Sequence, residues 1–301
     1  MKDLRQSPGW AYYLSHIGWT VKTLGKNQLF SKNIPLINRP FVKFQRPDNP
    51  LDFRVIDRLA KKEKWLFVLL EPTINGFDKN LFKKAGYKEA PKMSLTHTSS
   101  IHIDLTRSLD EIFMSFSENA RRNIRKSEKN SLKIKIIDLK KAKTDEQFKI
   151  FYQLFANLTK IKKFWAPDYS EYHKKMNGFK DSSVILFAYH NNKPIAAVWL
   201  GIFDKESWYM NTGIVEEGYD LLANYLLVWE AIKYSKNKHL KVFDFEGIYD
   251  PRFPSERSTW KRFTEFKKRF HGDIIEYPAP YIKIYSLGFK IFYLCTQKFY
   301  R

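Results

Sequence analysis

The sequence predicts a mixed α/β protein built from two domains. With 301 residues, of which 44% are hydrophobic and 17% aromatic, the chain can form more than one packed core. An unbroken apolar run at 65–70 is typical of a strand that is buried on both faces. Three apolar segments at 183–189, 194–203 and 207–211 are joined by short turns, and an amphipathic helix follows them at 221–236. Strands and helices therefore alternate in both halves of the chain.

Residues 1–97 are expected to form the first domain. Its first helix begins at Pro8, because proline is tolerated in the first helical turn, and its last helix ends at Gly86, a residue typical of C-caps. The final segment, 285–301, is a candidate to complete this domain. The elements expected within it are strands at 19–24, 26–38 and 41–44, a helix at 50–62, a strand at 65–70 and a helix at 78–85.

Residues 98–284 are expected to form the second domain. From Ile101 the predicted order is strand, helix, strand, two helices, three strands, helix, strand, helix and strand. Three strands joined by hairpins and followed by helix, strand, helix and strand make up the order of the acyl-CoA N-acyltransferase (GNAT) fold. The first domain repeats this order weakly, so the predicted fold class is α/β (α+β) with two GNAT-like domains. An analogy of fold gives no chemistry by itself.

The chain has a net charge of +21, from 53 Lys and Arg against 32 Asp and Glu. Such an excess suits a polyanionic partner, which can be a nucleic acid, an anionic membrane or a phosphorylated substrate. A lysine-rich composition of the whole genome is the competing explanation, because the charge is spread along the chain. Candidates for binding phosphate, against the alternative of solvated helix surfaces, are Arg121, Arg125, Lys163, Lys268 and Arg269.

One cysteine, Cys295, excludes internal disulfides and a zinc site built from thiolates. The seven histidines are scattered without close pairing, so no metal is expected. The first residues are polar and no apolar stretch is long enough to span a membrane, which predicts a cytoplasmic protein. A monomer is expected. The tail at 288–301 is apolar and basic. It either rests on the inner face of the cell membrane, as a peripheral contact, or packs on the first domain as a closing helix.

The strongest candidate site lies in residues 242–285, where an apolar strand, an acidic turn, a basic helix and an aromatic strand follow one another. Asp244 and Glu246 lie at the end of the first strand, and Lys267 follows Phe266 near the end of the helix. Each has a structural alternative. The two acids can bond backbone groups of the turn, and Lys267 can be a solvated residue that complements the helix dipole.

Several landmarks, in the same order along nearly the whole chain, resemble the Fem family of peptidoglycan-bridge aminoacyltransferases (FemA, FemB and FemX types). Each landmark is weak alone, and their ordered sum is fairly specific. The coiled-coil arm of some members has no counterpart, because no long heptad run occurs. The landmarks are Gln6–Trp10, Leu69–Pro72, Thr98–Leu105, Arg121–Arg125, Trp208–Met210, Ala223–Trp229, Asp244–Ile248 and Phe266–Gly272.

The resemblance implies an aminoacyl-tRNA as donor, with no separate cofactor, and the stem-peptide amine of a lipid-linked or UDP-linked peptidoglycan precursor as acceptor. Lys267 matches a family lysine suited to stabilise the oxyanion that develops on the ester carbonyl. Glu71 matches the family's acidic residue at a strand end. It would act on the attacking amine or position it, although a cap of the strand before Pro72 explains it equally.

Substrate contacts are expected from residues in or beside the matching motifs: Trp10, Tyr209, Asn211, Asp244, Glu246 and Phe266. Trp208 and Tyr209 alternate along a strand, so one of them is expected in the core. FemX-type members place basic residues for the phosphates of the precursor where this chain has Tyr12-Tyr13 and Trp165-Ala166-Pro167. The linkage of the acceptor is therefore left open.

Three functions compete at this point. The first is the tRNA-dependent aminoacyltransferase of cell-wall bridges. The second, a CoA-dependent N-acyltransferase of GNAT type, is disfavoured because Glu216, Glu217 and Asp220 precede the helix at 221–236 and would repel a pyrophosphate at its start. The third is a non-catalytic protein that binds RNA or a membrane on a GNAT scaffold.

Overall fold

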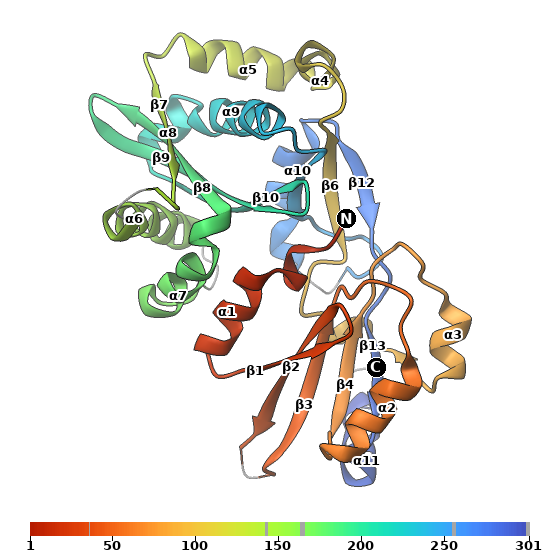
Figure 1. Cartoon of the computed structure of the whole chain (residues 1–301). Helices are drawn as coiled ribbons and strands as arrows, with labels where there is room; N and C mark the ends of the chain where they lie inside the picture. Colours follow the sequence, from red (N-terminus) through yellow and green to blue (C-terminus); the bar gives the residue numbers. More distant parts are fainter. Residues whose placement is uncertain (36, 142–143, 163–165, 255–256, 299–301) are drawn as a thin grey trace. The chain divides into compact units, whose positions relative to one another are not determined.

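The computed structural model describes residues 1–35, 37–141, 144–162, 166–254 and 257–298 (Figure 1). The chain divides into two compact units. Unit 1 comprises Met1, Ser7–Tyr13 and Ser99–Ile275, and unit 2 comprises Lys2–Gln6, Leu14–Thr98 and the chain from Glu276 onward. The predicted boundaries differ from these units at the single residues Met1 and Thr98 and in two longer segments. Residues 7–13 belong to unit 1, and residues 276–284 belong to unit 2.

Unit 2 is built on a six-stranded sheet with the order β1-β2-β3-β4-β13-β5. The first three strands pair antiparallel, β4 then pairs parallel with β3, and β13 pairs antiparallel with both β4 and β5. The pairing of β13 with β4 explains the boundary correction, because this strand completes the sheet of unit 2. The strands are β1 (Thr20–Leu24), β2 (Asn27–Ile34), β3 (Arg39–Gln45), β4 (Phe67–Glu71), β5 (Lys88–Glu89) and β13 (Tyr281–Ile284).

Helices cover both faces of this sheet. On one face, Ile56 and Ala60 of α2 (Phe53–Lys62) and Phe82 of α3 (Lys79–Lys84) pack with the strands. On the other face, α11 (Leu287–Lys298) places Phe289 on Phe67, with 4.7 Å between the ring centroids. The inner face of α11 therefore packs on this sheet, as a helix that closes the first domain would.

Unit 1 is built on a seven-stranded sheet with the order β12-β6-β11-β10-β9-β8-β7. Strands β7 to β10 pair antiparallel, β11 pairs parallel with β10, and β6 pairs antiparallel with β11. The strands are β6 (Ser99–Asp104), β7 (Lys133–Asp138), β8 (Ser183–His190), β9 (Lys193–Phe203), β10 (Glu206–Ile214), β11 (Val242–Gly247) and β12 (Asp273–Glu276).

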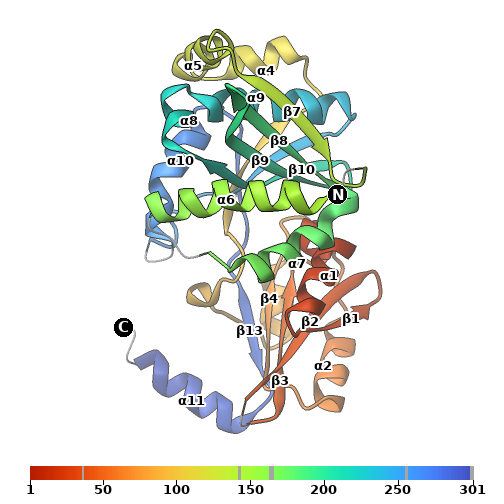
Figure 2. The same cartoon turned by 90° about the vertical axis from the view of Figure 1, so that its left-hand side faces the viewer.

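The helices of unit 1 lie in layers on the two faces of its sheet (Figure 2). One face is covered by α9 (Ala223–Asn237), on which α5 (Glu118–Glu128) packs, and the other by α6 (Thr144–Lys162). The other α-helices of the described chain are α1 (Pro8–His16), α4 (Leu109–Ser115), α7 (Tyr169–Phe179), α8 (Glu216–Asp220) and α10 (Lys261–Lys268). Across both units, short 3-10 turns lie at Leu4–Gln6, Pro91–Met93, Lys180–Ser182 and Ser258–Trp260.

The two sheets have the same design. In each, three antiparallel strands (β1–β3 or β8–β10) lead through a helix (α2 or α9) to a parallel strand (β4 or β11). In each, a strand that is distant in sequence (β13 or β6) is inserted beside that parallel strand, before the last strand (β5 or β12). The predicted fold class of two GNAT-like domains is confirmed by this repetition.

Part of the first sequence landmark has a structural role in unit 2. The side chain of Gln6 is buried, and its Nε2 donates to the carbonyl oxygens of Gln28 at 3.0 Å and Gln45 at 2.6 Å. Its Oε1 accepts from the Gln28 amide at 2.6 Å. Gln6 therefore ties the start of the chain to β2 and β3, because a buried amide that finds three backbone partners is strongly localised.

A close approach between α6 and β10 supports the packing of unit 1. A Cβ added at Gly213 would lie 2.5 Å from the amide nitrogen of Phe155 and 2.6 Å from the carbonyl carbon of Leu154. We expect Gly213→Ala to lower the free energy of unfolding by about 1–3 kcal/mol, because the helix must move away from the strand. Urea denaturation followed by circular dichroism measures this change.

Gly288→Ala is the matched control, because a Cβ there meets nothing within 4 Å. We expect it to leave the denaturation midpoint close to that of the unaltered protein. Equal midpoints for both variants would contradict the close packing of α6 on β10.

Candidate active site in unit 1

The site is organised by an irregularity in β11. The pairing of β11 with β6 shifts register between Asp244 and Gly247, and Glu246 has a φ of 60°, in the left-handed region that residues with a side chain rarely adopt. Such bulges bend a strand and free backbone groups from the regular ladder, and they are common beside active sites. Here the carbonyl oxygens of Phe245 and Gly247 become acceptors for a side chain of α10.

Lys267 supplies that side chain. It is buried, with 8% of its surface exposed, and its Nζ donates to the carbonyl oxygens of Phe245 at 2.7 Å and Gly247 at 2.8 Å. An ammonium group has three N–H donors. In the part of the chain that the structure describes, no acceptor contacts the third. The alternative of a solvated helix end is therefore excluded for Lys267.

Two aromatic rings and two acidic side chains surround the ammonium group of Lys267. Its Nζ lies 5.0 Å from the ring centroid of Phe263 and 5.9 Å from that of Tyr209. Burial lowers the pKa of Lys267 to about 8, while the charges of Glu246 and Asp244 act in the opposite direction. At neutral pH the group is still mainly protonated. A cation held at a fixed position in a medium of low polarity is well suited to stabilise a developing negative charge.

Asp244 holds the bulge in place. Its side chain is fully buried, and its Oδ1 accepts from the Glu246 amide at 2.6 Å and from the hydroxyl of Ser100. Its Oδ2 lies 3.1 Å from Nε2 of His102, and Ser100 also donates to the Glu246 carbonyl at 2.8 Å. These contacts match the structural alternative for Asp244, a carboxylate that bonds the backbone at the turn. They orient the two carbonyls that bind Lys267.

Ser100 and His102 were not singled out by the sequence. Both lie on β6, between the apolar residues Ile101 and Ile103, so they point to the opposite face of the sheet from those residues. The alternation itself was visible in the sequence. Their partner Asp244 is distant along the chain, and the antiparallel pairing of β6 with β11 brings them together.

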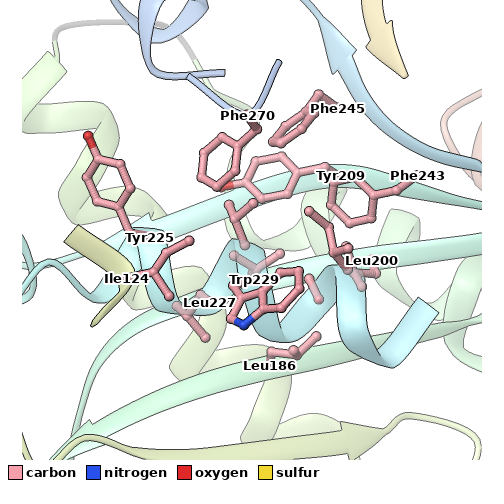
Figure 3. Packing of buried hydrophobic residues seen from close by; sticks show 14 of the residues in the cluster. Ile124, Leu186, Leu200, Tyr209, Tyr225, Leu227, Trp229, Phe243, Phe245 and Phe270 are labelled. Atoms are coloured by element: carbon pink, nitrogen blue, oxygen red, sulfur yellow. The ribbon is translucent and has the colours of Figure 1, made fainter. Parts of the chain in front are cut away.

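An aromatic wall lies in the core of unit 1, and Figure 3 shows three of its rings, Tyr209, Phe245 and Phe270. The rings of Tyr209 and Phe245 are 5.8 Å apart, and those of Phe245 and Phe270 are 5.4 Å apart. Phe266 lies at the edge of this wall, 5.1 Å from the ring of Tyr225. Burial raises the pKa of Tyr209 to about 12, so its hydroxyl remains protonated at neutral pH.

One of Trp208 and Tyr209 was expected in the core, but both side chains are buried. Trp208 is 1% exposed and Tyr209 is 5% exposed. Helices cover both faces of the sheet, so both directions of the alternation lead into packed interior.

Two other predicted substrate contacts lie elsewhere in unit 1. Asn211 follows a register shift in β10, and its buried Oδ1 accepts no hydrogen bond from the residues that the structure describes. Trp10 packs on Tyr13, with ring centroids 5.6 Å apart, and Nζ of Lys175 on α7 lies 5.9 Å from the Trp10 ring. An unsatisfied buried acceptor makes Asn211 a candidate for binding a donor group of a ligand.

Glu71 belongs to unit 2, at the end of β4. Its carboxylate is 1% exposed and accepts from the amides of Leu95 at 2.8 Å and Thr96 at 2.7 Å, from the Thr96 hydroxyl at 3.0 Å and from Gln45 at 3.3 Å. These contacts describe an anchor of the strand end, which was the structural alternative. Its role in moving a proton stays a prediction.

The predicted phosphate-binding residues divide into structural and exposed ones. Arg121 donates to the carbonyl oxygens of Met114 and Phe116 and so fixes the end of α4, and Arg269 donates to Asn119 and Tyr225. Lys268 is exposed and lies 3.4 Å from Glu265. Lys163 lies outside the described residues.

The exposed face of α5 forms a basic hollow of about 410 Å³ on the surface. Arg125 lies in it, with its guanidinium 5.4 Å from the ring of Phe113. A single acid accompanies the five cations. The hollow is lined by Glu118, Arg121, Arg122, Arg125, Lys126 and Lys129.

No metal site is evident in the described chain: its His, Cys, Asp and Glu residues form no group of three that could hold an ion.

Comparisons with known proteins agree on the fold. Residues 118–262 match the family described as an acetyltransferase (GNAT) domain. The structure is similar to FemX, with a TM-score of 0.81 and 15% identity over 97% of this chain and 94% of that one. No curated protein matches the sequence.

Two further solved structures are similar. One is a C-terminal domain assigned to a lysylphosphatidylglycerol synthetase from Agrobacterium fabrum, with a TM-score of 0.64 and 11% identity over 96% of this chain and 90% of that one. The other is L-PGS from Bacillus licheniformis, with a TM-score of 0.62 and 12% identity over 95% and 91%. The predicted resemblance to the Fem family is thus confirmed at the level of the fold.

The lowered pKa of Lys267 predicts a change of stability with pH. Between about pH 8 and its ordinary pKa of 10.5, the unfolded chain holds a proton that the folded chain has released. Stability therefore rises with pH in this window, by up to about 3 kcal/mol relative to a Lys267→Met variant that lacks the titrating group. Urea denaturation of both proteins from pH 7 to pH 10.5 measures the difference. A difference that stays constant with pH would contradict the burial of the amine.

Proposed function

We propose that the protein is an aminoacyltransferase that moves an amino acid from aminoacyl-tRNA to the stem-peptide amine of a peptidoglycan precursor. The observation that supports this function best is the buried ammonium group of Lys267, which two backbone carbonyls hold while its third N–H has no acceptor in the described chain. The likeness to FemX over 97% of the chain supports the choice of reaction within the acyltransferase fold.

The chemistry of the transfer fits this group. The attacking amine forms a C–N bond to the ester carbonyl, and the carbonyl oxygen becomes negative. The third N–H of Lys267 would donate to that oxygen, and the two carbonyl contacts would keep it aimed during the reaction. Collapse of the intermediate breaks the ester C–O bond. The amine nitrogen loses one proton and the leaving ribose hydroxyl gains one, so the transfer consumes no net proton.

The apolar wall beside Lys267 would serve the same step. Tyr209 and Phe263 keep water from the ammonium group, and a donor in a dry site interacts more strongly with a developing charge. Asn211 would accept a hydrogen bond from the substrate through its buried Oδ1. The precursor is lipid-linked or UDP-linked in this proposal, and the donor needs no separate cofactor.

A second candidate is the aminoacylation of a lipid head group. The similarity to L-PGS and to the domain assigned to a lysylphosphatidylglycerol synthetase favours it. The same electrophile and the same cation would serve, and a hydroxyl would replace the amine as nucleophile. Labelled aminoacyl-tRNA pools incubated separately with lipid-linked precursor, UDP-linked precursor and phosphatidylglycerol distinguish the acceptors by which mixture gives a labelled product.

A CoA-dependent transfer is disfavoured by the residues before α9. Glu216 and Glu217 open α8, both are exposed, and the exposed Asp220 ends it. Three carboxylates at this point oppose a pyrophosphate, which needs free amides and positive charge. Retention of the protein on a CoA resin would instead favour a CoA-dependent transfer.

Lys267→Met tests the proposed catalytic role. We expect the rate of aminoacyl transfer to fall by about 10²–10³-fold, because one preorganised oxyanion donor is lost, while the affinity for tRNA stays unchanged. Single-turnover transfer from labelled aminoacyl-tRNA measures the rate. Lys193→Met is the control, because this lysine is exposed at the start of β9 and is not among the candidate phosphate contacts. Loss of transfer in both variants, or in neither, would refute the role of Lys267.

The basic hollow on α5 predicts a tRNA surface. We expect the triple variant Arg122→Gln, Lys126→Gln and Lys129→Gln to weaken tRNA binding and to lower the slope of log K against log salt by about 2–3, because three phosphate contacts are removed. The charge-matched control neutralises three exposed lysines of unit 2: Lys61, Lys83 and Lys84. An equal loss in the control would assign the binding to net charge alone.

A further inference from the structure

The outer face of α11 is apolar and uncovered. Phe289 and Tyr293 face the sheet of unit 2, where they pack against Leu66, Phe67 and Leu69. On the opposite side, four large apolar side chains are more than half exposed: Leu287 at 74%, Ile291 at 57%, Phe292 at 61% and Leu294 at 51%. Figure 2 shows α11 continuing from the end of β13 and projecting away from the sheet.

The spacing makes these residues one surface. Leu287, Ile291 and Leu294 lie four and three residues apart and form a stripe along one side of the helix, and Phe292 widens it. Exposed apolar residues that occur singly are ordinary on a protein surface. Four on successive turns of a 12-residue helix form a continuous patch, and such patches mark a surface that something covers.

The basic residues near the patch favour an anionic partner. The sequence after Glu276 contains no acidic residue, and Lys290 and Lys298 belong to α11, whereas Lys283 on β13 pairs with Asp57 at 2.7 Å. Lys290 is exposed beside the apolar stripe. The whole chain has a net charge of +21. A helix with an apolar face, basic flanks and no acid is the pattern of helices that lie in the head-group region of anionic bilayers.

We infer that α11 is a peripheral membrane anchor whose outer face inserts into an anionic lipid surface. Leu287, Ile291, Phe292 and Leu294 enter the boundary between head groups and acyl chains, while Lys290 contacts lipid phosphates. None of the described helices combines the length and apolarity that crossing a bilayer requires, so the contact is interfacial. The inner face of the same helix stays packed on unit 2. This inference does not rest on the proposed transfer reaction.

Flotation of the full chain with lipid vesicles tests the anchor. The unaltered protein should float with vesicles of phosphatidylglycerol and phosphatidylcholine, and less with phosphatidylcholine alone, because the basic tail needs anionic lipid. The double variant Ile291→Ser and Phe292→Ser should lower the vesicle partition coefficient by about tenfold or more. Lys290→Glu should lower binding to the anionic vesicles only.

A matched control separates this surface from general apolar exposure. Ile74→Ser with Leu81→Ser removes two side chains of unit 2 that are 44% and 52% exposed, and it should leave flotation unchanged. Circular dichroism checks that each variant is folded. Absence of flotation in the unaltered protein overturns the anchor. An equal loss in the control also overturns it, as does a change in sedimenting mass of the Ile291→Ser, Phe292→Ser variant without lipid, which would assign the face to contacts between copies.

Discussion

The burial of one lysine amine against an irregular strand is the constraint on which the rest of unit 1 depends. An ammonium group loses its hydration when it is buried, and that cost must be offset by hydrogen bonds. A regular strand could not supply them, because its carbonyls are committed to the ladder. The bulge in β11 frees two carbonyls for Lys267, and Asp244 with Ser100 keeps the bulge in shape. The left-handed backbone at Glu246 is part of the same arrangement.

The two units use one topology for different purposes. In both, the parallel strand next to the hairpin strands bears a carboxylate that accepts backbone amides: Glu71 on β4 and Asp244 on β11. In unit 2 this carboxylate accepts from Gln45 on β3 and from Leu95 and Thr96 in the segment that follows β5. In unit 1 the carboxylate of Asp244 supports the bulge in β11, and Lys267 of α10 donates to the two carbonyl oxygens that the bulge exposes. The difference explains why the chemistry is assigned to unit 1 although the folds are alike.

Hydrophobic periodicity and short motifs predicted the order of helices and strands and the candidate Lys267. They did not predict contacts between strands that are distant in the sequence. Strand β13 was placed in the wrong domain because its partner β4 is some two hundred residues away, as the pairing of Tyr281 with Leu70 shows. Ser100 and His102 were missed for the same reason. Arg121 was predicted to bind phosphate because a motif gives residue types without orientation, and only the contacts of its guanidinium with the end of α4 show that it is used internally.

The proposed mechanism requires that Lys267 interacts more strongly with the negative oxygen of the tetrahedral intermediate than with the neutral ester. The most direct measurement compares two ligands that carry the same 3′-terminal nucleotides, a phosphonate analogue of the tetrahedral intermediate and the matching neutral amide. The account predicts that the unaltered protein prefers the phosphonate and that Lys267→Met abolishes this preference without changing the affinity for the amide. An equal loss of affinity for both ligands would contradict it.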